Sequence, residues 1–161
     1  MKDQLRRKLR EEIELSEAIV AMGADVVPRF RVLTPDGEYQ ILVQMKEDDQ
    51  ADRLARLKLV AGYMAWKLAS GFVVSGETIE PAGIFSFAIS AETVEGVFTT
   101  IEHDADGQLV IGEPQHLTHE QCDPVFALMM PGPRAEIDAE TMARLKELFG
   151  AGGEMEARPV H

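Results

Sequence analysis

The feature that most constrains the fold is a predicted helix from Asp52 to Ala69 that is apolar on two sides. One stripe has the three- and four-residue spacing of a buried helical face and contains Leu54, Leu57, Ala61, Met64, Ala65 and Leu68. A second stripe on roughly the opposite side contains Leu59, Tyr63 and Trp66. A helix of this kind must pack against other parts of the protein, or against a partner, on both of its apolar sides. We expect it to lie between a β-sheet and a second layer, either the N-terminal helix or a partner chain, with Trp66 substantially buried.

Hydrophobic periodicity predicts the remaining elements. The predicted helices cover Lys2–Met22 and Asp138–Gly150, and the predicted strands cover Arg29–Leu33, Tyr39–Met45, Phe72–Ile79, Ile84–Ile89, Gly96–Ile101 and Leu109–Ile111. Thr34-Pro35-Asp36-Gly37 predicts a tight turn between the first two strands. The resulting order is α-β-β-α-β-β-β-β-α. Because short turns demand antiparallel pairing, we predict an α+β fold: a single, mostly antiparallel sheet of about five to six strands, with helices packed mainly on one face.

Length and composition indicate one globular unit. The chain has 161 residues, enough for a hydrophobic core, and no apolar run approaches the length of a membrane span. We expect a single domain over residues 1–150, followed by a flexible C-terminal tail over residues 151–161. The single cysteine, Cys122, cannot form an internal disulfide, which fits a cytoplasmic location.

The net charge of −12 is unevenly distributed. Residues 1–12 carry five basic and three acidic side chains, so the rest of the chain carries −14. A body of that charge repels phosphate backbones, and we expect no nucleic-acid binding. Four of these five basic residues form a patch, which consists of Arg6, Arg7, Lys8 and Arg10. They fit the solvated face of an amphipathic helix, although contact with an anionic partner is the alternative.

One cluster contains metal-ligating residue types. His116, His119 and Cys122 follow one another at intervals of three, with His103 upstream. Imidazole and thiolate are the ligands that zinc prefers, so these three residues are the candidate metal ligands. A closed zinc site needs a fourth ligand, which the spacing does not supply. We therefore expect the chain to fold without a metal and to need no cofactor.

The same segment also has a structural interpretation. Thr118 and Gln121 have the spacing of a capping box at a helix start, and Leu117 and Cys122 would form its hydrophobic staple. This interpretation uses the cluster to begin a helix instead of binding a metal.

Another cluster, which is acidic, has a spacing similar to that of a calcium-binding loop. Glu102, Asp104, Asp106, Gly107 and Glu113 occupy loop positions one, three, five, six and twelve. The flanking segments read as strands, whereas an EF-hand needs helices. We therefore predict a hairpin tip here, with Asp-Gly as its turn.

Gly71–Thr78 has the glycine spacing of a phosphate-binding loop, but Glu77 stands at the lysine position. This charge reversal argues against nucleotide binding. Glu77 is then either a buried acid with a raised pKa or the exposed end of a strand.

The leading functional hypothesis is a non-enzymatic protein that acts by association as a homodimer, through the two-faced helix, the N-terminal helix, or both. The second apolar stripe, eight methionines and the apolar segment Leu128–Pro131 favour a surface that another molecule covers. One alternative is a small metal-dependent enzyme or metal-binding protein that uses His116, His119 and Cys122. The other is a small-ligand sensor with a cleft between sheet and helix.

Overall fold

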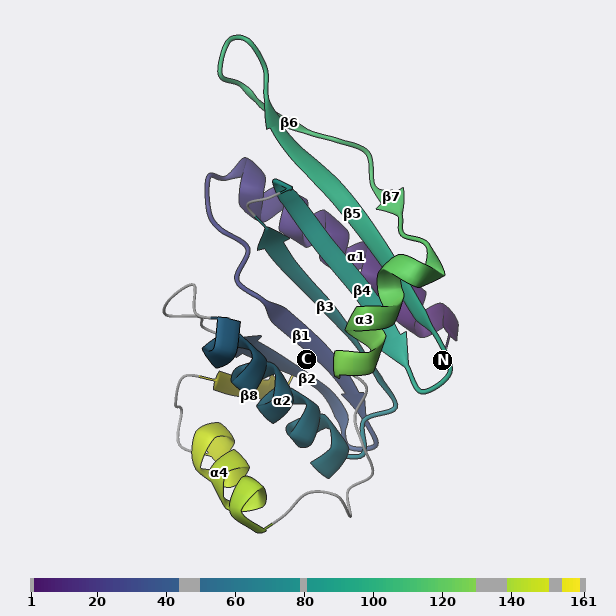
Figure 1. Ribbon diagram of the computed structural model, residues 1–161, viewed down its shortest axis with the longest axis vertical. Helices are drawn as coiled ribbons and strands as arrows, with labels where there is room; N and C mark the ends of the chain where they lie inside the picture. The colour runs from purple at the N-terminus through teal and green to yellow at the C-terminus, as the bar shows by residue number, and fades with distance from the viewer. Residues whose placement is uncertain (1, 44–49, 79–80, 130–138, 151–154, 160–161) are drawn as a thin grey trace.

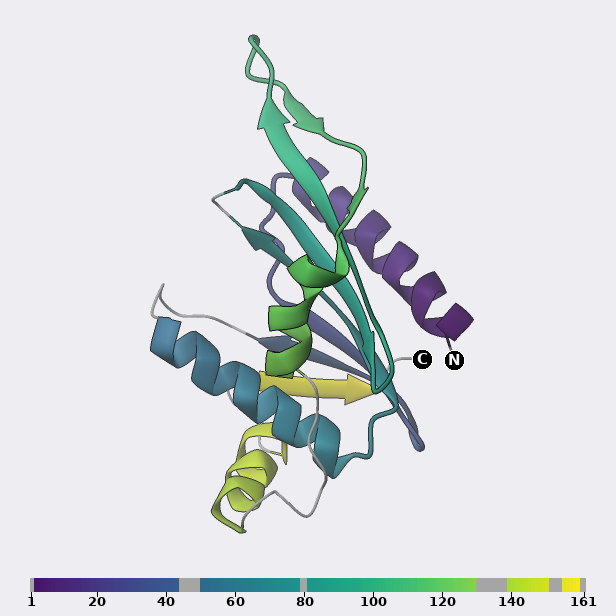
Figure 2. The same ribbon diagram turned by 45° about the vertical axis from the view of Figure 1, so that its right-hand side comes forward.

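The computed structural model describes residues 2–43, 50–78, 81–129, 139–150 and 155–159. An antiparallel β-sheet forms its centre. Helix α1 (Lys2–Ala21) covers one face, and helices α2 (Gln50–Trp66), α3 (His119–Met129) and α4 (Ala139–Gly150) lie on the other side (Figure 1, Figure 2). The predicted α+β class is therefore confirmed, and most helices share one face, with α1 as the exception.

The strands follow the order β6-β5-β4-β3-β1-β2-β8, and β7 also pairs with β5. Their bounds are β1 Arg29–Thr34, β2 Gly37–Val43, β3 Gly71–Thr78, β4 Gly83–Ser90, β5 Val94–His103, β6 Leu109–Ile111, β7 Gln115–His116 and β8 Met155–Pro159. All pairings among these strands are antiparallel. Because β1 lies between β2 and β3, helix α2 is part of a crossover connection.

Local turn chemistry sets the first hairpin as predicted. Thr34 pairs with Gly37, which adopts a φ of 136°, and the Thr34 hydroxyl donates to the Gly37 carbonyl oxygen at 2.9 Å. Glycine accommodates this positive φ without a steric penalty. The register places Phe30 and Ile41 opposite each other, and both are buried.

The apolar core lies between the sheet and α2. It contains Phe30, Val32, Ile41, Val60, Tyr63, Met64, Phe72, Phe87, Ile89, Val94, Cys122 and Leu145. Val60 is fully buried although it belongs to neither predicted stripe. At Gly62 a Cβ atom would lie 3.4 Å from Leu145 Cδ1. This is an ordinary van der Waals distance, and it shows that α4 packs directly against α2 at this turn.

Of the two covers expected for the second stripe of α2, the N-terminal helix does not supply it, because α1 lies on the opposite face of the sheet (Figure 2). Helices α3 and α4 lie against α2 instead. Tyr63 is buried, whereas Trp66 is only partly buried. The two rings meet edge to face at 5.9 Å, and Lys67 Nζ lies 4.6 Å from the Trp66 ring centroid. The side chain of Leu54 lies outside the described residues.

The C-terminal segment differs from the predicted flexible tail. Met155–Pro159 forms β8, which pairs with β2 along the edge of the sheet. Backbone pairing does not require an apolar pattern, so the composition of this segment hid the strand. Three predicted boundary residues, Met45, Ile79 and Asp138, lie outside the described residues, as do 151–154 and 160–161 of the tail.

Helix α3 begins as the capping box predicts. The Thr118 amide donates to Gln121 Oε1 at 2.8 Å, and the Gln121 amide donates to Thr118 Oγ1 at 3.3 Å. These reciprocal bonds satisfy amide groups that a helix start leaves without intrahelical partners. Cys122 and Leu117 pack into the core as the predicted staple requires.

Candidate functional site: a groove beside helix α1

Helix α1 is attached to the sheet by apolar contacts near both ends. Leu5 and Leu9 pack against Val73, Ala88 and Val97 on the sheet, in one cluster with Leu33. At the other end of the helix, Val20 packs with Val26 and Ile84. These contacts hold α1 across β3 and β4.

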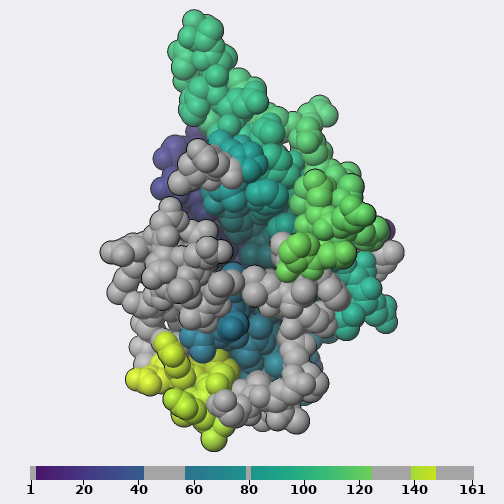
Figure 3. All heavy atoms as spheres, viewed as in Figure 1, coloured from purple at the N-terminus to yellow at the C-terminus, as the bar shows by residue number. Residues whose placement is uncertain are grey.

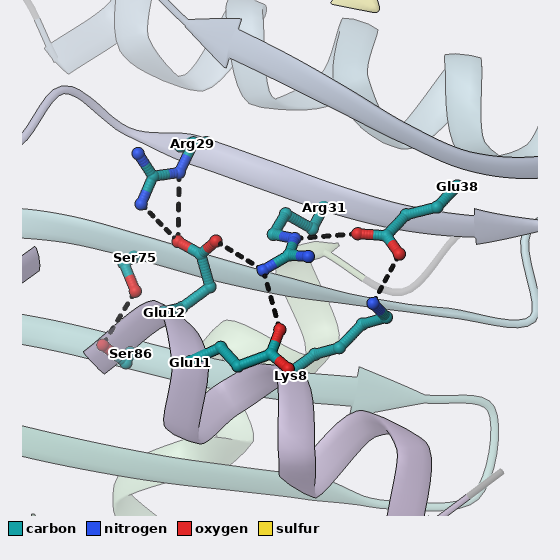
Figure 4. A network of polar contacts seen from close by, with 8 residues as sticks. All are labelled: Lys8, Glu11, Glu12, Arg29, Arg31, Glu38, Ser75 and Ser86. Carbon is teal, nitrogen blue, oxygen red and sulfur yellow. Dashed lines mark hydrogen bonds and ion pairs between the residues drawn. The ribbon is translucent and has the colours of Figure 1, made fainter. Parts of the chain in front are cut away.

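The middle of α1 contacts the sheet through a buried acid (Figure 4). The Glu12 side chain is 0% exposed. Arg29 donates to Glu12 Oε2 from Nε at 3.0 Å and from Nη2 at 2.5 Å, and Arg31 donates from Nη1 to Glu12 Oε1 at 3.2 Å. A buried carboxylate is tolerated when such donors compensate the loss of water.

The network continues to strand β2. Arg31 Nε donates to Glu38 Oε1 at 2.8 Å, and Lys8 Nζ lies 2.5 Å from Glu38 Oε2. Burial alone would raise the pKa of Glu38, but the bonds from Lys8 and Arg31 outweigh it and lower that pKa. Because the contacts are directional, the network fixes the rotation of α1 about its axis as well as its position.

Further polar groups lie buried on this face. The hydroxyls of Ser75 and Ser86 are 2.8 Å apart across β3 and β4. Ser16, one turn after Glu12, is fully buried, and its Oγ has no hydrogen-bond partner among the described residues. The centre of the interface between α1 and the sheet is therefore polar.

A groove of about 650 Å³ runs along the other flank of α1, beside β5. Its lining consists of Arg6, Leu9, Arg10, Ile13, Glu14 and Glu17 from α1, and of Glu95, Val97, Pro114 and His116 from the sheet side. Leu9 and Val97 are buried and Ile13 is half-buried, whereas Arg10 and Glu14 are exposed. The groove thus has an apolar floor below charged walls.

The walls carry both signs of charge. Arg6 crosses the groove to Glu95, with 2.6 Å between Nη2 and Oε1. Within the described part of the chain, Arg10, Glu14 and Glu17 form no salt bridge. Burial and the nearby Glu14 carboxylate raise the pKa of Glu17. An open groove with an apolar floor and mixed charges is suited to a protein surface or an amphipathic molecule.

The three candidate metal ligands are not brought together. His116 is exposed and lines the groove, paired with Val97 across the strands. Cys122 lies on the opposite face of β5, where a Cβ atom on Gly96 would be 2.9 Å from its Sγ. His119 is exposed at the start of α3. The described residues contain no group of three or more His, Cys, Asp or Glu positioned for a metal ion.

Cys122 is also poorly suited to reactivity. It is 1% exposed, and burial raises the pKa of its thiol. A thiol reacts and ligates as the thiolate, which burial disfavours.

The acidic cluster resembling a calcium loop forms the predicted hairpin tip between β5 and β6. The amides of Asp106 and Gln108 both donate to Asp104 Oδ1 at 2.9 Å. Gly107 adopts a φ of 77°. The hairpin extends beyond the rest of the described chain (Figure 1, Figure 3), and Leu109 and Val110 on it are exposed.

The other residues singled out in the sequence lie apart from the groove. Glu77 is exposed near the end of β3, where its carboxylate accepts a hydrogen bond from the Val26 amide at 3.2 Å. This matches the exposed-strand interpretation. His103 is exposed at the end of β5. The side chains of the apolar segment Leu128–Pro131 lie outside the described residues.

Sequence reasoning missed the buried network and the groove. Both depend on α1 lying against strands that are distant in the sequence. One signal was present: Arg29 and Arg31 alternate with the apolar Phe30 in a predicted strand, which the structure shows as β1, with a neighbouring strand on each side. Charged residues at such positions require partners.

Comparisons with known proteins identify no relative of this chain. No protein-family model, curated protein or solved structure matches this chain. Among the described residues, no helix is both long enough and apolar enough to cross a membrane.

Proposed function

We propose that this chain acts by association without catalysing a reaction, and that its working form is a cytoplasmic homodimer. One observation carries the proposal. The groove beside α1 presents an apolar floor, formed by Leu9, Ile13 and Val97, between exposed charged groups of both signs. Such a surface combines apolar area with polar groups that set orientation, as protein interfaces do.

The chemistry of the titratable groups also supports association. Glu12, a fully buried acid, accepts hydrogen bonds from two arginines, and these contacts occupy its carboxylate away from solvent. Cys122, the single cysteine, is buried with a raised thiol pKa. Neither group is placed to act as a nucleophile or as a general acid.

Light scattering across a dilution series tests this proposal. We expect the mass to approach twice 17.8 kDa at high micromolar concentration and to fall on dilution. A stable interface of this kind should bury upwards of about 1,000 Å² in total. A mass of 17.8 kDa at every concentration would remove the homodimer.

A small amphipathic ligand is the second candidate, because the groove volume of about 650 Å³ falls within the size range of ligand sites. This sensor hypothesis predicts that a small molecule bearing a carboxylate shifts NMR signals of Arg10 and His116 saturably. Signals that shift without saturating, or shifts of equal size throughout the protein, would contradict the sensor hypothesis. Binding of this kind is compatible with a monomer, so the mass measurement separates the two candidates.

A further inference from the structure

The exposed side of α1 carries a charge stripe with internal symmetry. Arg7, Arg10, Glu14 and Glu17 follow one another at intervals of three, four and three residues. This spacing places them along one side of a helix. Arg7, Arg10 and Glu14 are exposed, and the described residues provide none of the four with a salt bridge.

The order of these charges is unfavourable for α1 alone. Basic residues lie toward the N-terminal end of α1 and acidic residues toward its C-terminal end, with no basic residue in the last turn. The helix dipole favours the opposite arrangement. The pairing of Arg10 with Glu14 in the same helix also has the less favourable orientation. A sequence that conflicts with its own local structure points to a requirement elsewhere.

We infer that a second copy of this chain docks against α1 with its own α1 antiparallel, so that Arg7 faces Glu17 and Arg10 faces Glu14 of the partner. The inference rests on the proposed homodimer and names its surface. Reversing the direction of the stripe puts each arginine opposite a glutamate, and the two-fold axis makes every contact twice. The groove floor at Ile13 lies beside this stripe and supplies apolar contact.

Two single charge reversals test the pairing. In Arg10→Glu, positions 10 and 14 are both acidic, and in Glu14→Arg both are basic. Each variant should therefore repel its own copy, and we expect dimer dissociation constants raised roughly 10- to 100-fold. Both side chains are exposed, so the fold should persist, which circular dichroism verifies. Lys58→Glu and Glu147→Arg make the same charge changes at exposed positions on α2 and α4, which lie on the other side of the sheet (Figure 2), and should leave the mass unchanged.

Mixing provides the sharper measurement. The antiparallel pairing predicts that Arg10→Glu and Glu14→Arg, each monomeric alone, form a one-to-one heterodimer when combined, and that added salt weakens it. Light scattering of each variant and of the mixture reads this directly.

The outcomes distinguish the two proposals. If both variants dimerise as well as the Lys58→Glu and Glu147→Arg controls, the α1 pairing is wrong while the homodimer stands. If both are monomeric and the mixture stays monomeric, the antiparallel register is wrong. If the unaltered chain is monomeric throughout, the homodimer and this surface both fail.

Discussion

The two faces of the sheet are covered in different ways. On the α2 face, the buried residues are largely aromatic and aliphatic, with Phe30 and Phe72 in contact at 5.9 Å between ring centroids. On the α1 face lie the buried polar residues of the described chain, which are Glu12, Ser16, Arg29, Ser75, Ser86 and Thr99. One sheet therefore supports an apolar core on one side and a mixed polar interface on the other.

The two faces therefore contribute differently to the protein: one mainly to the stability of the fold, the other mainly to the orientation of helix α1. Apolar burial stabilises in proportion to area and has little directional preference. A buried ion-pair network adds little net stability compared with apolar packing, but its hydrogen bonds are satisfied in one arrangement only. We infer that the α2 face provides most of the stability, and that the α1 face orients the helix whose outer side is available for association.

Truncating an aromatic residue of the apolar face should have the largest effect. Phe72 is 1% exposed in the middle of the sheet, and Phe72→Ala should lower the free energy of unfolding by about 3–5 kcal/mol. Urea denaturation followed by circular dichroism measures this. Leu68→Ala, at a side chain that is 58% exposed, is the control and should cost less than about 1 kcal/mol. Equal losses would contradict the assignment of stability to this face.

Removing the acid from the polar face should cost nearly as much. Glu12→Ala leaves Arg29 buried without its carboxylate partner, and we expect a loss of about 3 kcal/mol in the free energy of unfolding. Gln4→Ala is the matched control at an exposed position of the same helix that lies outside the proposed interface. A loss below about 1 kcal/mol for Glu12→Ala would mean that the network is solvated in solution.

Replacing both partners should cost less than removing one. In Glu12→Leu/Arg29→Met, no charge of that pair remains, and Arg31 keeps its bonds to Glu11 and Glu38. We expect this double variant to lose about 1 kcal/mol or less, well below Glu12→Ala. A loss equal to the sum of the two single variants in the same denaturation experiment would show that the pair itself stabilises the fold.

Among these substitutions, Tyr63→Phe on the α2 face should have the smallest effect on the free energy of unfolding at neutral pH. Burial, with a smaller contribution from Tyr39, raises the pKa of Tyr63 to about 12. Because the folded state holds the phenol proton more tightly than the unfolded state, stability should fall as pH rises from about 10 to about 12. Tyr63→Phe should lack this part of the decline. An identical alkaline profile for the variant would place Tyr63 in contact with solvent.

The sequence predicted local features of the fold better than it predicted which helices cover each face of the sheet. The Pro35-Asp36-Gly37 turn and the capping box of Thr118 and Gln121 are set by neighbouring residues, and both are present. The strand predicted at Phe72–Ile79 is also present, as β3, and its buried residues Phe72 and Val73 belong to the apolar clusters on opposite faces of the sheet. Periodicity therefore sufficed for elements whose partners are close in sequence or whose sides are both apolar.

The features that could not be predicted from the sequence depend on contacts between segments that are distant along the chain. The pairing of Glu12 with Arg29 required knowing which face α1 covers, and hydrophobic patterns do not distinguish the two faces. Strand β8 is held by the backbone of β2, which leaves no side-chain pattern to read. The candidate site was missed for the same reason. His116 lies at the groove, but Cys122 points to the other face of β5 and His119 does not line the groove.

Amide hydrogen exchange at low and high protein concentration tests the central claim most directly, because it reads α1 and α2 separately in the unaltered chain. Association through α1 predicts that exchange in Lys2–Ala21 slows as concentration rises, while exchange in Gln50–Trp66 stays the same. Slowing confined to α2, or no concentration dependence in α1, would contradict the claim that the oriented outer side of α1 is the surface through which this protein associates.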